Sequence, residues 1–213
     1  MTRADLTHLY FLLDRSGSMQ SIKTDTEGGF EAFIAEQRKA PGECRVTLAQ
    51  FDNEYDVVYA DRPLADVPAL DLQPRGSTAL LDAMGRTITD AGTRLAALPE
   101  AERPGTVIVA IMTDGHENAS QEWTRPAIKA LVTQQSTQFA WQVMYMGADQ
   151  DAIEVGAGLG VAAANSVTYS RGKAREAMAA SSDKVRGLRH ARMSEPAAAM
   201  PAFTPEERAD LNS

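Results

Sequence analysis

The sequence predicts an α/β layer fold, with a mostly parallel sheet and helices on both of its faces. Strand-like and helix-like segments alternate along the chain, which is typical of parallel strands joined by crossover helices. The segment TVIVAIMTD at 106–114 is the most apolar run of the chain. A strand that is apolar on both faces is covered by helices on both sides, so this segment is expected at the centre of the sheet.

A change of period indicates the first strand and the first helix. HLYFLLD at 8–14 is an apolar run that ends in a carboxylate. From 19 to 39 the apolar residues follow a helical spacing instead. Gly28 and Gly29 weaken this helix and are expected to let it pack closely on the sheet.

The middle of the chain predicts a hairpin, an irregular connection and a long helix. The β-rich segments 44–52 and 55–60 are separated by only two residues, which is a hairpin signal. A proline-rich stretch follows up to Thr78, and residues 79–98 have the apolar face of a helix. Beyond the central strand, the expected elements are helices at 124–137, 149–160 and 171–190, a strand at 139–147, and an edge strand at 166–170.

We expect residues 1–190 to form this domain and residues 191–213 to form a flexible tail. Ala and Pro dominate the start of the tail, but a helix-start signature follows. Thr204 would be the N-cap and Glu207 its reciprocal partner in a capping box. The side chains expected to dock this short helix on the domain are Phe203 and Leu211.

Composition and charge narrow the possible roles. The net charge of −8 argues against a basic, nucleic-acid-binding surface. The single cysteine, Cys44, excludes an intrachain disulfide and fits a reducing compartment. The chain has no run of roughly 18 apolar residues, and its N-terminal apolar run is too short for a signal peptide. We therefore expect a cytoplasmic monomer that binds neither nucleic acid nor membrane.

Oxygen-bearing side chains lie at three element ends on one edge of the predicted sheet. Asp14, Ser16 and Ser18 come directly after the first strand, around a glycine that lets the backbone curve. Thr78 precedes a helix, and Asp114 ends the central strand. Ligands of such sheets bind outside the carboxyl ends of the strands, where the strand order reverses. Two carboxylates and three hydroxyls form a hard-oxygen set that suits Mg²⁺.

The same motifs carry a family resemblance. DxSxS after the first strand, GST before a helix and TDG at the end of the central strand together resemble a von Willebrand factor type A (VWA) domain with its metal-ion-dependent adhesion site (MIDAS). The resemblance covers roughly residues 7–170 and implies a three-layer, Rossmann-like sheet with one antiparallel edge strand, here 55–60. The chain looks like a stand-alone, bacterial type of VWA protein. The resemblance implies that Mg²⁺ or Mn²⁺ binds directly to Ser16, Ser18 and Thr78, and often through water to Asp14 and Asp114.

Each motif alone has a structural interpretation. Asp14 and Ser16 can cap the following helix, Thr78 can cap the next one, and the Asp-Gly pair of the third motif can form a turn. The convergence of all three favours the metal site. GAGLG at 156–160 lacks the context of a dinucleotide fingerprint, because it does not link a strand to the start of a helix.

We interpret the site as a protein-interaction module in which an Asp or Glu of a partner protein completes the metal shell. One alternative is a metal-assisted hydrolase, for which only His116 and Glu117 are nearby candidate bases. Another is a structural or regulatory subunit of a bacterial stress or resistance complex. The loops around the site are expected to present Arg15 and Arg75, which would favour an acidic partner. The other expected rim residues are Asn53, His116, Glu117 and Trp123.

Overall fold

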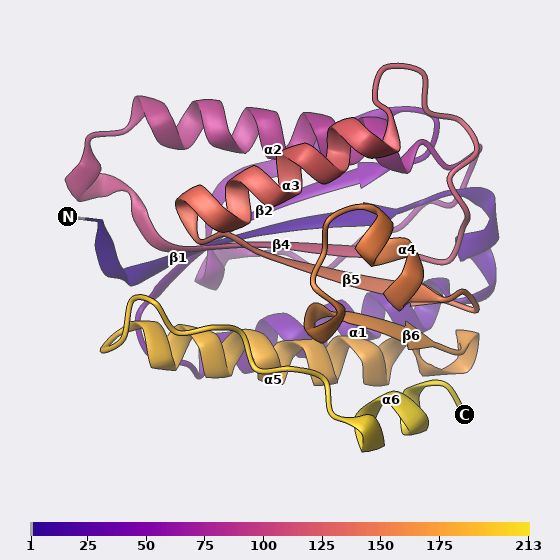
Figure 1. The fold of residues 1–213 in the computed structure, drawn as a ribbon. Coiled ribbons are helices and arrows are strands. Elements are labelled where there is room, and N and C mark those ends of the chain that lie inside the picture. Colours follow the sequence, from indigo (N-terminus) through magenta and orange to yellow (C-terminus); the bar gives the residue numbers. More distant parts are fainter. Residues whose placement is uncertain (1) are drawn as a thin grey trace.

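The computed structural model describes residues 2–213, which form a six-stranded sheet between two layers of helices (Figure 1). The strands are β1 (Arg3–Asp14), β2 (Glu43–Phe51), β3 (Tyr55–Pro63), β4 (Pro104–Thr113), β5 (Gln142–Ala148) and β6 (Ser166–Tyr169). The helices are α1 (Lys23–Arg38), α2 (Leu80–Ala97), α3 (Arg125–Phe139), α4 (Ala152–Gly158), α5 (Ala174–Arg192) and α6 (Pro205–Leu211). The predicted three-layer α/β fold is confirmed.

The strand order is β3-β2-β1-β4-β5-β6. Every neighbouring pair is parallel except β2 and β3, which form an antiparallel hairpin. The antiparallel edge strand implied by the resemblance is therefore β3, and β6 lies at the opposite edge, as expected. The chain moves outward from β1 to β3 and then returns to the centre for β4. The strand order thus reverses between β1 and β4, which is where such sheets bind ligands.

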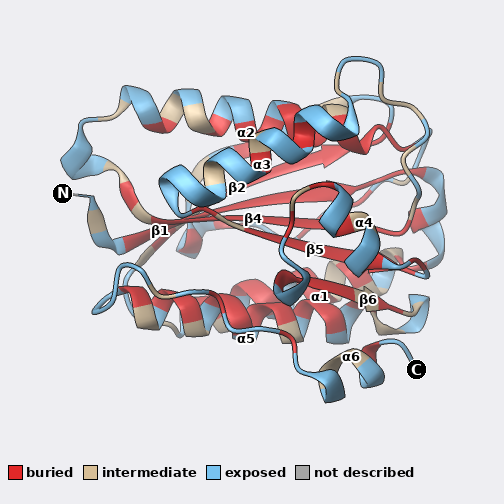
Figure 2. Ribbon diagram, in the orientation of Figure 1, coloured by how far each residue is buried: buried red, intermediate tan, exposed pale blue. Residues whose placement is uncertain are grey.

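Each face of the sheet has its own hydrophobic core (Figure 2). Helices α1 and α5 cover one face, and α2, α3 and α4 cover the other. Along β1, Leu9, Phe11 and Leu13 belong to the first core, whereas Tyr10 and Leu12 belong to the second. The outer sides of the helices are exposed, and within residues 2–213 no helix combines the length and apolar character needed to cross a membrane.

Gly28 and Gly29 face another helix. They lie where α1 packs against α5. A Cβ on Gly29 would lie 3.1 Å from the Cα of Arg175 and 3.1 Å from the Cβ of Met178. The glycines therefore permit close packing of two helices within one layer, and the prediction that they pack against the sheet is wrong.

The chain after α5 ends in the short helix α6. The predicted capping box is confirmed: the backbone N–H of Glu207 donates to Thr204 Oγ1 at 3.2 Å, and that of Thr204 donates to Glu207 Oε2 at 2.7 Å. As expected, Phe203 and Leu211 are buried, and they belong to the same hydrophobic core as the apolar side chains of α5. The flexibility expected of residues 191–213 stays a prediction.

The end of the chain also contacts β6. The guanidinium of Arg208 donates to the carbonyl oxygens of Ser166 at 2.5 Å and Ala163 at 2.6 Å. The backbone N–H of Ser170 donates to the carbonyl oxygen of Leu211 at 2.9 Å. These contacts fix α6 beside the edge of the sheet.

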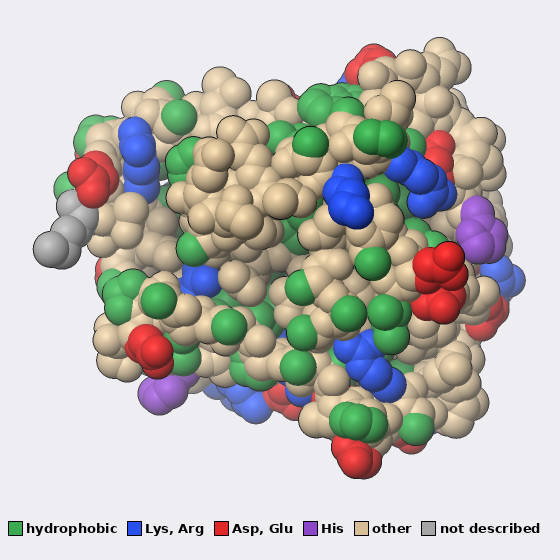
Figure 3. All heavy atoms as spheres, in the orientation of Figure 1, with side chains coloured by type: hydrophobic (Ala, Val, Ile, Leu, Met, Phe, Trp, Pro, Cys, Tyr) green, Lys and Arg blue, Asp and Glu red, His purple; other side chains and the backbone are tan. Residues whose placement is uncertain are grey.

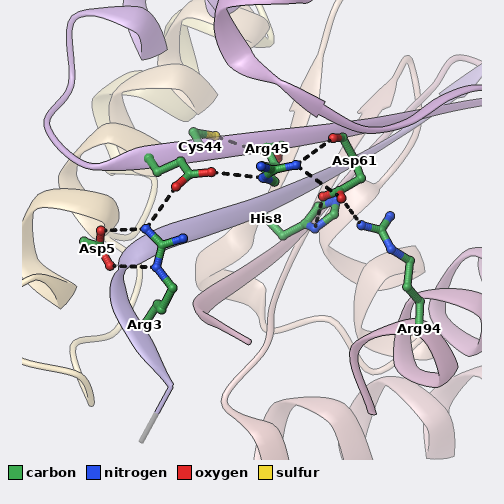
Figure 4. A network of polar contacts seen from close by, with 8 residues as sticks. Arg3, Asp5, His8, Cys44, Arg45, Asp61 and Arg94 are labelled. Carbon is green, nitrogen blue, oxygen red and sulfur yellow. Dashed lines mark hydrogen bonds and ion pairs between the residues drawn. The ribbon is translucent and has the colours of Figure 1, made fainter. Parts of the chain in front are cut away.

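Charged side chains surround a buried histidine on β1 (Figure 4). The ring of His8 stacks on that of Tyr10, with centroids 4.1 Å apart, and its Nε2 lies 2.9 Å from Thr47 Oγ1. Thr47 Oγ1 also accepts from the backbone N–H of Asp61 at 3.0 Å, and Nδ1 of His8 lies 3.7 Å from Asp61 Oδ1. Burial lowers the pKa of His8 to about 3; the charge of Arg94 acts in the same direction, and the Asp61 carboxylate opposes it.

Candidate functional site

The five expected site residues lie together at the carboxyl ends of β1 and β4. Asp14 is the last residue of β1, and Ser16 and Ser18 follow it directly. Asp114 follows the last residue of β4, and Thr78 precedes α2. Since β1 and β4 are adjacent and parallel, their ends meet at the reversal of the strand order, at the right of Figure 1.

Backbone hydrogen bonds hold the loops of the site together. The N–H of Gly17 donates to the carbonyl oxygen of Gly76 at 3.2 Å, and the N–H of Ala79 donates to that of Asp52 at 2.8 Å. Gly76 has a φ of +68°, and a Cβ at this position would collide with the side chain of Asn53. The loop before Thr78 therefore requires glycine here.

A chain of hydrogen bonds runs through the site. Ser18 Oγ donates to Asp114 Oδ1 at 2.6 Å, which uses the only hydroxyl proton of Ser18. Ser16 is therefore the donor in the 3.0 Å contact between the two serine hydroxyls. Asp14 Oδ1 accepts from the backbone N–H of Ser16 at 2.6 Å, and its Oδ2 accepts from Thr113 Oγ1 at 2.5 Å.

Two features mark the point on which these oxygens converge. Asp114 Oδ2 is buried and has no hydrogen-bond partner among the residues that the structure describes. A Cβ on Gly115 would lie 2.6 Å from Thr78 Oγ1, 3.4 Å from Asp14 Oδ2 and 3.5 Å from Ser16 Oγ. Glycine at this position, in the third motif, thus preserves a small space lined by oxygens from the other two motifs.

Burial raises the pKa of both carboxyl groups. It raises the pKa of Asp14 to about 6, against the hydrogen bonds from Thr113 and Ser16. It also raises the pKa of Asp114, against the hydrogen bond from Ser18 and the charge of Arg171. A cation between the two carboxyls would favour their charged forms. Residues 2–213 contain no cluster of three or more His, Cys, Asp or Glu suited to a metal, so any ion here would depend on the hydroxyls.

The arginines at the rim are paired within the protein. Arg15 is buried, and its guanidinium lies 3.0 Å from Asp52 and 2.5 Å from Asp56. The guanidinium of Arg75 lies 2.8 Å from Asp52 and 2.5 Å from Glu54. The acids of the β2–β3 hairpin therefore offset the charges of both residues, and their attraction for an acidic partner stays a prediction. Basic and acidic side chains are also interspersed over the face in Figure 3.

The loop after β4 is fixed to the start of α2. The carboxylate of Glu117 accepts three backbone N–H groups and the hydroxyl of Ser120. Trp123 is partly buried and packs against α2 at Gly85. Glu117 is thus a structural cap, whereas His116 beside it is exposed.

Two charged residues beside Asp114 are not among the residues predicted from the sequence. Arg171 follows β6, and Asp149 follows β5. The guanidinium of Arg171 lies 3.6 Å from Asp114 Oδ2 and 3.1 Å from Asp149 Oδ2. The sequence does contain a signal for them, because both follow predicted strands whose carboxyl ends meet at this edge.

Solved structures share this architecture, although no protein-family model and no curated protein matches the sequence. Proximal thread matrix protein 1 from the mussel byssus, with a zinc-occupied MIDAS motif, has a TM-score of 0.60 at 14% identity, over 84% of this chain and 46% of that chain. The ArnB paralog VWA2 from Sulfolobus acidocaldarius has a TM-score of 0.52 at 15% identity, over 82% and 44%. The vWF domain of the type V pili tip protein Mfa5 from Porphyromonas gingivalis has a TM-score of 0.59 at 10% identity, over 85% and 95%.

These similarities establish the fold and nothing finer, because the identities are low. The chain spans a little under half the length of the mussel and Sulfolobus proteins, so the activities of those whole proteins do not transfer to it.

Proposed function

Given this VWA-like fold, we propose that the chain is a divalent-metal-dependent protein-interaction module. An Asp or Glu of a partner protein would complete the shell of the bound ion. The observation that carries the proposal is the convergence of Thr78 Oγ1, Asp14 Oδ2 and Ser16 Oγ on the space beside Gly115, the residue that follows Asp114. Within residues 2–213, Asp114 Oδ2 is buried and accepts no hydrogen bond. The residues that would hold Mg²⁺ or Mn²⁺ are Asp14, Ser16, Ser18, Thr78 and Asp114.

The donor set fits a hard divalent cation, since all five side chains offer oxygen. As the resemblance implies, Ser16, Ser18 and Thr78 would bind directly, and the two carboxylates through water. Ser18 already donates its proton to Asp114, which leaves a lone pair for an ion. A bound ion would supply a Lewis-acidic position for an outside anionic oxygen. Because the hydroxyls carry no charge, they would not weaken its attraction for a partner's carboxylate.

Two further observations favour interaction over hydrolysis. Glu117, a candidate base, is occupied by four hydrogen bonds at the start of α2. A general base must reach the water it activates, and this carboxylate is held by the backbone instead. The names of two similar structures, a thread matrix protein and a pili tip protein, also support a role in binding other proteins.

Gly115→Ala tests the site directly. Its methyl group would occupy the space on which the oxygens converge and would displace Thr78 Oγ1. We expect metal affinity to fall about 10- to 100-fold, as when the support of a metal ligand is disturbed. The measurement is isothermal titration of chelator-treated protein with Mg²⁺ and Mn²⁺. Gly92→Ala in α2 is the matched control, because a Cβ there meets nothing within 4 Å. No heat from wild type with either ion at millimolar concentration would contradict the proposal.

Partner binding requires a separate measurement. Immobilised wild type and Thr78→Ala are exposed to a native lysate in Mg²⁺ or in chelator. The proposal expects a partner that wild type retains in Mg²⁺ and loses in chelator, and that Thr78→Ala fails to retain. A partner held equally in all of these conditions would leave the site without this role. Metal binding without any such partner would favour a subunit whose ion only fixes loops.

A further inference from the structure

Arg171 brings a positive charge to Asp114 from the turn Arg171–Lys173 that follows β6. Its Nη2 lies 3.6 Å from Asp114 Oδ2, the carboxylate oxygen that has no hydrogen bond within residues 2–213. Its Nε lies 3.1 Å from Asp149 Oδ2. The guanidinium therefore pairs with two acids, one after β4 and one after β5.

Arg171 differs from the other arginines at this end of the sheet. Arg15 and Arg75 each donate hydrogen bonds to two carboxylates. In the described part of the chain, Arg171 makes ion pairs but no hydrogen bond, and 45% of its side chain is exposed. Since 3.6 Å is too long for a hydrogen bond, its contact with Asp114 is electrostatic. The guanidinium can therefore leave Asp114 without breaking a hydrogen bond.

We infer that Arg171 is an internal competitor of the divalent cation and keeps the metal affinity of the site low. The inference rests on the proposed function, because it concerns the regulation of the same site. Without an ion, Arg171 offsets the negative charge of Asp114. An ion beside Asp114 repels the guanidinium, which keeps Asp149 as its partner.

The backbone around Arg171 holds its charge near the site. The N–H of Ser170 donates to the carbonyl oxygen of Leu211 at 2.9 Å, which ties the turn to α6. The N–H of Asp149 donates to the carbonyl oxygen of Tyr169 at 3.0 Å, which ties the second acid to β6. Even a displaced guanidinium thus remains close enough to oppose the binding of the ion.

Removing this charge should strengthen metal binding. In isothermal titration with Mn²⁺ and Mg²⁺ at low ionic strength, Arg171→Gln should bind about three- to tenfold more tightly than wild type, since a unit charge roughly 6 Å from a dication opposes binding by that order. The gain should shrink as ionic strength rises. Arg171→Lys keeps the charge and should remain near wild type. The increase in Tm on adding Mg²⁺ should be larger for Arg171→Gln than for wild type.

Arg186→Gln is the matched control. The Arg186 side chain is 44% exposed and also pairs with two acids, Glu36 of α1 and Asp183 of α5. Its substitution should leave metal affinity unchanged. Equal or weaker binding by Arg171→Gln would overturn the competitor role and leave the proposed function intact. Metal binding by none of the proteins would overturn both.

Discussion

Lowering the pH from about 7.5 to about 5 should destabilise this protein through His8. Only 2% of His8 is exposed, and burial lowers its pKa to about 3. In an unfolded chain, a histidine has a pKa of about 6.5. Between these two values the unfolded chain binds a proton that the folded chain does not bind. The free energy of unfolding therefore falls as the pH falls through this range.

The magnitude follows from the size of the pKa difference. Each pH unit below about 6.5 lowers the free energy of unfolding by about 1.4 kcal/mol. At a pH of about 5, His8 should therefore lower it by about 2 kcal/mol. Asp14 acts in the opposite direction, because its pKa in the folded protein is raised to about 6. From an unfolded pKa of about 3.9, its contribution to stability is lost as the pH rises toward 6. The wild-type curve sums both groups, so a variant is needed to isolate His8.

His8→Gln supplies that comparison. Urea unfolding of wild type and variant is measured in chelator at several pH values between about 5 and 7.5. His8→Gln should be the less stable protein at the higher pH, because it loses the ring stacking with Tyr10. The difference in free energy of unfolding between wild type and His8→Gln should be about 2 kcal/mol smaller at the lower pH. His190→Gln is the control, since His190 is exposed. Parallel stability curves for wild type and His8→Gln would refute the reasoning.

Three further predictions concern the core, the site and the tail. Val109→Asp should lower the free energy of unfolding by about 3–5 kcal/mol and prevent folding as seen by circular dichroism, because it buries an unpaired charge. Val57→Asp should fold, because Val57 on β3 is about half exposed. Asp14→Ala should abolish metal binding in titration yet keep the wild-type circular dichroism spectrum; an unfolded variant would make Asp14 structural. Limited proteolysis should cut near Ala197–Ala199, where the chain has no helix or strand, and leave residues 1–190 able to bind metal. Loss of binding after that cut would mean that the tail belongs to the site.

Much of the fold could be predicted because its determinants are local. A strand covered on both faces needs an uninterrupted apolar run, as in β4, and the covering helices need a regular apolar stripe. The meeting of Asp14, Thr78 and Asp114 could be predicted for a similar reason. Strand ends are visible in sequence, and parallel strands bring their carboxyl ends to one edge.

The errors and omissions concern contacts between distant side chains. No periodicity shows that Asp52 pairs with both Arg15 and Arg75, so the internal partners of these two residues could not be predicted. Arg171 lies two strands and two α-helices beyond Asp114. The sequence places both residues at the same edge of the sheet, but it does not show that their side chains meet. Gly28 indicated that α1 packs closely on another element. Which element it meets depends on the layer that α1 joins, and the arrangement of the whole sheet decides that layer.

The contacts of Arg208 beside β6 also bear on self-association. An edge strand offers backbone groups to which a strand of another molecule can add. β6 is the last strand on its side of the sheet, and Arg208 occupies the carbonyl oxygens of Ser166 and Ala163. A side chain bound there satisfies the acceptors without presenting a new row of donors and acceptors to the solvent. We therefore expect the C-terminal helix to hinder the addition of a strand at the Ser166 end of β6, and a chain shortened before Phe203 should aggregate more readily even with its metal-site loops intact.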